Sequence, residues 1–149
     1  MKKVQRNIGA MGIMGLGEVK REMRVKFKFM GEFEKLKVWQ LATELAVDVY
    51  SLVKRNPELK RDLRFAGQIT SASVSIPSNI AEGDEVNTIK QSINYFYIAK
   101  GSAAELVTQL IIAERIGYIS EVDSKTTIAK AKMVSAALNK MIVARKKWQ

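Results

Sequence analysis

Apolar side chains recur every three or four residues along most of the chain after Gly31, which is the spacing of one buried helix face. Four such stretches cover residues 38–53, 59–80, 89–113 and 128–141, and short breaks separate them. In the first stretch, Trp39, Ala46, Tyr50 and Val53 widen the apolar face, so we expect other chain segments to contact that helix on two sides. The pattern predicts four helices with short connections.

Local signals mark where these helices begin. Asn56 can cap free N–H groups, and Pro57 fits the first turn of the second helix. Residues Thr88–Gln91 have the form of a capping box before the third helix, and Ser120–Asp123 open the fourth. Helices joined by such short connections favour an all-α, antiparallel, up-down-up-down four-helix bundle.

The end of the second helix is harder to assign. Gly83 and Gly117 are placed to end the second and third helices. Residues 71–76 alternate between polar and apolar side chains, as a strand does, and Pro77 would break or kink a helix interior. The pattern alone therefore leaves residues 71–76 open between strand and helix.

Composition divides the chain of 149 residues near Gly31. Residues 1–31 hold five of the 9 Gly and five of the 7 Met, and residues 1–33 carry eight basic and three acidic side chains. We expect residues 1–31 to be a flexible basic arm or sequence upstream of a later Met start, with a dedicated nucleic-acid-binding arm as the alternative. Residues 32–149 are then the helical domain.

Missing residue types exclude several classes of chemistry. The chain has no Cys and no His, which excludes disulfides, thiolate metal sites, His ligands and the usual general base of serine hydrolases. Ser51 and Lys54 match S-x-x-K, the nucleophile motif of penicillin-recognising enzymes. The S-D-N and K-T-G motifs of those enzymes do not follow in this chain. We expect no enzymatic activity and no cofactor. No stretch approaches the length of a membrane span, and we expect a cytoplasmic protein without a membrane partner.

The one dense acidic cluster comprises Glu82, Asp84 and Glu85. A magnesium site there is conceivable, but acidic residues just before a helix more often stabilise its N-terminus. Whether the cluster binds a cation stays open at this point, and we predict no metal site.

Small residues inside two of the helices predict close helix packing. A mid-helix Gly costs about 1 kcal/mol of helix propensity, which is reasonable where another helix must approach closely. The positions concerned are Gly67, Ser71 and Ser75 in the second helix and Gly101, Ser102, Ala103 and Ala104 in the third.

Four blocks of sequence resemble one protein family. They are FEKLKVWQ (33–40), SVSIPSNIAEG (73–83), YIAKGSAAEL (97–106) and GYI (117–119). Together they resemble the family of 23S rRNA intervening-sequence proteins, over roughly residues 33–142. The resemblance implies a four-helix bundle in which residues 71–76 are helical and Pro77 bends the second helix. It also implies a homo-oligomer, specifically a pentamer, and relatives that bind RNA and a reverse transcriptase.

The chain departs from that family beside its most specific block. Family members often carry an Arg pair where this chain has Thr70 and Ser71, and basic residues where it has Asp84 and Glu85. An RNA-binding surface in that region is therefore in doubt, and the helix ends are the better place to look.

Basic side chains give the clearest functional indication. Lys and Arg number 25 against 15 Asp and Glu, a net charge of +10, which favours phosphate-rich partners. We predict contacts with RNA, or with DNA, from basic residues near the helix ends and along one stripe of the fourth helix. They are Lys54, Arg55, Lys60, Arg61, Arg64, Lys125, Lys132, Arg145, Lys146 and Lys147.

Apolar side chains in excess of those that one bundle core can bury predict self-association. After the main stripe of each helix is assigned, large side chains remain that a single bundle core cannot bury. The predicted subunit interface comprises Trp39, Tyr50, Tyr95, Tyr97, Val107 and Ile111.

These observations favour a non-enzymatic, homo-oligomeric helical bundle that binds nucleic acid, with RNA as the first candidate. The alternative is a protein-interaction scaffold or an accessory subunit, for example of a reverse transcriptase, that does not bind nucleic acid directly.

Overall fold

The computed structural model describes residues 15–21 and 32–148. The chain divides into two units, residues 1–31 and 32–149. In the first unit, residues 16–21 are helical and exposed. The rest of the predicted flexible arm lies outside the described residues.

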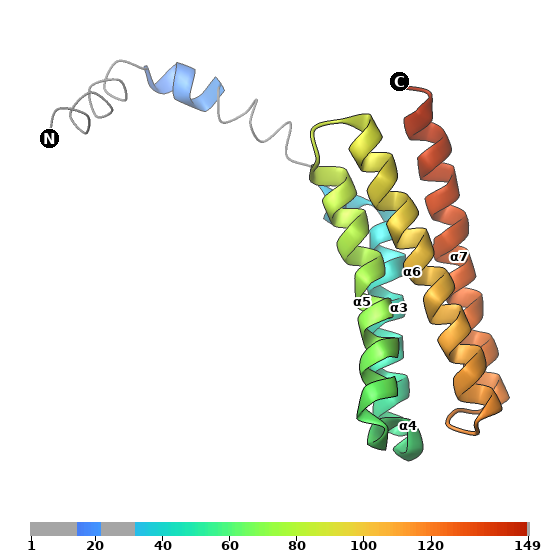
Figure 1. Cartoon of the computed structure of the whole chain (residues 1–149). Helices are drawn as coiled ribbons and strands as arrows, with labels where there is room; N and C mark the ends of the chain where they lie inside the picture. Colours follow the sequence, from blue (N-terminus) through green and yellow to red (C-terminus); the bar gives the residue numbers. More distant parts are fainter. Residues whose placement is uncertain (1–14, 22–31, 149) are drawn as a thin grey trace, which may run out of the picture. The chain divides into compact units, whose positions relative to one another are not determined.

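The regular secondary structure of residues 32–148 is entirely helical, and these residues contain no strand. Four long helices, α3, α5, α6 and α7, lie side by side (Figure 1). Residues 71–76 are helical within one of them, which excludes the strand alternative and confirms the helix that the family resemblance implied. The elements in chain order are η1 (Phe33–Lys35), α3 (Lys37–Arg55), α4 (Pro57–Arg61), α5 (Leu63–Glu85), α6 (Ile89–Arg115) and α7 (Glu121–Lys146).

One apolar core joins the four long helices. Helices α3 and α6 each pack against both α5 and α7. The largest fully buried side chains come from all four helices and from α4, and they occupy positions that the apolar spacing predicts. Among them are Leu45, Leu52, Leu59, Ile76, Phe96, Leu106 and Leu138.

Most of the predicted helix ends are confirmed. The Thr88 hydroxyl accepts a hydrogen bond from the Gln91 backbone N–H at 3.2 Å, and Ser120 accepts one from the Asp123 N–H at 3.1 Å. Gly117 follows α6 with φ of 80°, a conformation that favours glycine and that turns the chain toward α7.

Two predictions about the second helix are wrong. That helix is divided, because α4 ends at Arg61 and α5 begins at Leu63 with Asp62 as its cap. The Asn56 side chain does not cap α4 either, since its amide donates to the Leu52 carbonyl at 2.8 Å and so closes the end of α3. Helix α5 then runs through Pro77, which lies inside it.

Gly83 does not end α5 but lies buried within it. A Cβ at this position would lie 2.7 Å from Cε1 and 2.9 Å from Cδ1 of Phe96, so glycine allows α5 to approach α6. Gly67 and Gly101 have no heavy atom within 4 Å of an added Cβ, so the predicted close packing at these two glycines is wrong. The close approach is confirmed at Ser75 and Ser102, whose hydroxyls are 2.9 Å apart.

In the described residues, no helix is long and apolar enough to cross a membrane.

Candidate nucleic-acid interface

Five basic side chains surround α4, at the end of α3 and the start of α5. We call Lys54, Arg55, Lys60, Arg61 and Arg64 the α4 basic cluster, and all five are exposed. Within residues 54–64, only Glu58 and Asp62 oppose them. These five side chains therefore lie around one helix junction, and their contact with nucleic acid stays a prediction.

Helix α4 is held firmly although it is only five residues long. Leu59 is fully buried in the core, and Pro57 occupies the first turn, where a missing N–H costs nothing. Because Leu59 faces inward, the neighbouring Lys60 and Arg61 face solvent.

Asp62 joins this junction to the connection between α6 and α7. One carboxylate oxygen, Oδ1, accepts from the Phe65 backbone N–H at 3.0 Å, and Oδ2 accepts from the Tyr118 hydroxyl at 3.1 Å. The hydrogen bond to Asp62 raises the pKa of the Tyr118 hydroxyl. The rings of Phe65 and Tyr118 also meet edge to face, with centroids 6.1 Å apart. Asp62 therefore links the start of α5 to the connection between α6 and α7, which is distant in sequence.

Ion pairs neutralise part of the cluster. Arg61 pairs with Glu58 on the same short helix, and Arg55 pairs with Asp123 of α7 at 2.8 Å. Lys54, Lys60 and Arg64 form no ion pair with any described residue. These three cations are the best placed to meet phosphates.

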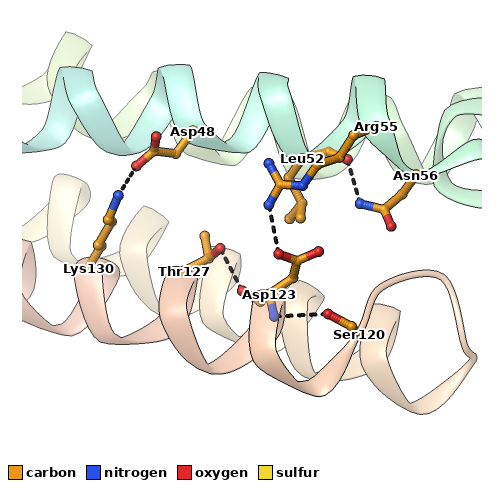
Figure 2. A network of polar contacts seen from close by, with 8 residues as sticks. All are labelled: Asp48, Leu52, Arg55, Asn56, Ser120, Asp123, Thr127 and Lys130. Carbon is orange, nitrogen blue, oxygen red and sulfur yellow. Dashed lines mark hydrogen bonds and ion pairs between the residues drawn. The ribbon is translucent and has the colours of Figure 1, made fainter.

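Figure 2 shows that Arg55 belongs to a polar seam between α3 and α7. Asp123 accepts from Arg55, its backbone N–H donates to Ser120, and its carbonyl accepts from the Thr127 hydroxyl at 2.8 Å. Farther along the seam, Lys130 of α7 pairs with Asp48 of α3. Arg55 therefore helps to hold α7 against α3, in addition to contributing a positive charge to the α4 basic cluster.

The predicted stripe on α7 is exposed at Lys125, Lys132 and Lys146. Lys125 pairs with Glu121, and this hydrogen bond lowers the pKa of the Glu121 carboxyl and raises the pKa of Lys125. Lys132 forms no ion pair with a described residue.

The basic residues at the end of α7 are separate from the α4 basic cluster. Arg55 of that cluster pairs with Asp123 near the start of α7, whereas Arg145 lies twenty-two residues further along the helix, or about 33 Å of helix rise. Arg145 donates to Asp84 at 2.7 Å and lies over the Phe96 ring, and the exposed fractions of the Arg145 and Asp84 side chains are 25% and 10%. Lys146 donates to the Tyr97 hydroxyl, whereas Lys147 is exposed. Arg145 therefore fastens α7 to α5, and little of its charge faces solvent.

The acidic cluster is also divided. Asp84 is the partner of Arg145, whereas Glu82 and Glu85 are exposed. The described residues contain no group of three Asp or Glu side chains arranged to hold a metal ion.

An apolar groove lies between α3 and α5, away from the basic residues except at Lys54. Its volume is about 560 Å³. Its lining comes from η1 (Phe33), from α3 (Trp39, Thr43, Ala46, Val47, Tyr50, Ser51 and Lys54) and from α5 (Val74, Pro77, Ser78 and Ala81). We call this feature the α3–α5 groove.

The six predicted interface residues do not form one surface. Trp39 and Tyr50 line the α3–α5 groove, whereas Tyr97 and Ile111 are exposed on α6. Tyr95 is half-buried, and Val107 packs against the core.

Asp62, Val47 and Val74 belong to these surfaces but are not among the predicted site residues. Asp62 precedes an apolar run, as helix-capping residues do, and that signal was available. Val47 and Val74 line the groove from neighbouring helices, and only their placement in space shows that they belong together.

Fold and surfaces together define a small, all-helical protein with a basic helix junction and an open apolar groove. The chain belongs to the family of 23S rRNA-intervening sequence proteins, whose model matches residues 34–140. It is similar to a crystal structure of a protein of unknown function from the S23 ribosomal protein family of Bacteroides thetaiotaomicron. The two chains are 24% identical with a TM-score of 0.67, over 70% of this chain and 97% of the other. The comparison with curated proteins finds no match.

Proposed function

We propose that this chain is a non-enzymatic, homo-oligomeric helical protein that binds RNA through phosphate contacts from the α4 basic cluster. We also propose that its long helices form an antiparallel up-down-up-down bundle, bent at Pro77 in α5. The resemblance implies a pentamer.

The RNA proposal is supported by unpaired basic side chains on a helix junction that is held in place. Lys54, Lys60 and Arg64 lack acidic partners among the described residues, and the helix junction that carries them is held by Leu59 and Asp62. Contacts of this type neutralise phosphates and do not read base edges, so binding would be largely independent of sequence. In an oligomer, the cluster is repeated once per subunit, which enlarges the positive field.

The absence of catalysis is part of the proposal. The chain has no His or Cys, and Ser51 and Lys54 both lie in the last turns of α3, facing the open α3–α5 groove. An open apolar groove does not supply the buried, oriented base that activates a serine nucleophile.

Charge reversal tests the RNA proposal. We expect Lys60→Glu, Arg61→Glu and Arg64→Glu together to weaken binding to a fluorescent single-stranded RNA at least tenfold in 50 mM salt. The matched control combines Lys37→Glu, Lys90→Glu and Lys140→Glu, which changes the net charge equally at exposed positions outside the α4 basic cluster. Equal losses in both variants would show that binding depends on net charge alone and would contradict the proposed site.

The α3–α5 groove supports a second candidate, a protein-interaction scaffold or an accessory subunit of a reverse transcriptase. Exposed apolar grooves of this kind are typical of sites for protein partners. On this alternative, the chain binds RNA weakly even in 50 mM salt, and the charge reversals leave that weak binding unchanged.

A further inference from the structure

The α3–α5 groove is an apolar surface without a cover in the described part of the chain. Val47 has an exposed fraction of 60%, and Tyr50 and Val74 beside it are also exposed. Apolar positions follow α3 from Trp39 to Tyr50, and the groove ends at Lys54. From Trp39 to Lys54 is fifteen residues, or about 22 Å of helix.

A second exposed apolar surface lies on α6. Ile112 and Ile116 have exposed fractions of 43% and 52%, and Ile111 beside them is also exposed. Glu105 is exposed on the same side, two turns earlier on the helix. We call Glu105, Thr108, Ile111, Ile112 and the C-cap residue Ile116 the α6 ridge. From Glu105 to Arg115, the last residue of α6, is about 15 Å of helix.

The groove and the ridge are complementary in charge as well as in apolar character. Lys54 has no acidic partner among the described residues. The Glu105 carboxylate accepts a hydrogen bond from the Gln109 side chain at 3.2 Å and likewise pairs with no described cation. Each surface therefore carries one charge that the other could pair, and a pairing of Lys54 across the contact leaves Lys60 and Arg64 as the unpaired cations of the α4 basic cluster.

One antiparallel register satisfies both kinds of match. If Glu105 of one chain faces Lys54 of another, Ile112 lies opposite Val47, because each is seven residues from the paired charge. Ile116 then lies opposite Thr43, which is eleven residues from Lys54. The exposed isoleucines of the ridge thus fall within the apolar length of the groove.

We infer that the α6 ridge of one copy of this chain occupies the α3–α5 groove of a second copy. This inference rests on the self-association in the proposed function and specifies its interface. Because each chain contributes the groove to one neighbour and the ridge to another, the contact is heterologous, and repeated contacts of this kind close into a ring or extend as a filament.

Mixing two defective full-length chains tests the inference. Val47→Asp places a charge in the groove, and Ile112→Asp places one on the ridge. Both side chains are exposed, so we expect both variants to keep the helical circular dichroism of the wild type. In sedimentation velocity at 50 µM, each variant alone should be a monomer. An equimolar mixture should form a dimer that grows no further, because it contains one intact groove–ridge pair.

Charge exchange gives a second readout. Lys54→Glu and Glu105→Lys should each reduce assembly, and the double variant should restore it, while Lys132→Glu on α7 should have no effect. An assembled wild type whose variants fail to complement would overturn the groove–ridge pairing alone and assign the groove to another occupant, such as an amphipathic helix of a different protein. A monomeric wild type at 50 µM would overturn the self-association as well, and neither result depends on RNA.

Discussion

Replacing Gly83 by Ala tests whether the contact between α5 and α6 depends on a missing side chain. The new Cβ would lie 2.7 Å from Cε1 of Phe96 and 3.1 Å from Cβ of Tyr95. Phe96 is fully buried and lies beneath Arg145, so its ring has little room to move. Overpacking of a filled core costs about 1–3 kcal/mol, whereas Ala in place of Gly in a helix gains about 1 kcal/mol. We expect Gly83→Ala to reduce the free energy of unfolding by up to about 2 kcal/mol.

Gly67→Ala is the matched control, because Gly67 lies in the same helix and an added Cβ would meet nothing within 4 Å. This variant should raise the free energy of unfolding by about 0.5–1 kcal/mol. Guanidinium unfolding at a fixed protein concentration measures both variants, and the difference between them, about 1–3 kcal/mol, isolates the overpacking cost. If Gly83→Ala stabilises the chain as much as Gly67→Ala does, the reasoning about this contact is refuted. In a Phe96→Leu background, the cost of Gly83→Ala should be smaller.

Three further predictions concern single side chains that affect the stability of the helices. Tyr118→Phe should lower stability at neutral pH. The raised pKa of Tyr118 means that the stabilising bond to Asp62 is complete below about pH 10 and is lost as pH rises through that pKa, so the difference from the wild type should shrink in alkaline unfolding titrations. Arg145→Met should reduce the free energy of unfolding by about 1.5–3 kcal/mol, because it leaves the Asp84 carboxylate without its charged partner. In an Asp84→Asn background the same change should reduce it by less. An equal loss in both backgrounds would contradict the pairing. Pro77→Ala should stabilise α5 by less than about 3 kcal/mol, because the helix gains an N–H but loses buried ring contacts; a loss of stability in thermal unfolding would contradict this.

The helical core was predictable because its signals are local. Apolar spacing identifies the buried faces, and the caps at Thr88 and Ser120 depend on residues three positions away. Residues 71–76 were ambiguous because Ser alternates there with apolar side chains, and packing of α5 between α3 and α6 decides in favour of a helix. Gly83 was misassigned for a related reason, since only the position of Phe96 on another helix explains it.

The candidate site was predictable only in part. The α4 basic cluster could be found because its members are close in sequence. The partners of Arg55 and Arg145 lie on other helices, sixty or more residues away, so the sequence could not show which charges are neutralised. The α3–α5 groove also joins residues from two helices, and its shape follows from how those helices pack.

The salt dependence of RNA affinity tests the central claim most directly. Fluorescence anisotropy with the full-length chain and a single-stranded RNA should show binding at 50 mM salt. If about six phosphates are engaged, affinity should fall by about 10³-fold or more at 200 mM, because each phosphate contact releases counterions. No detectable binding at 50 mM salt, or an affinity that does not change between the two salt concentrations, would contradict the account.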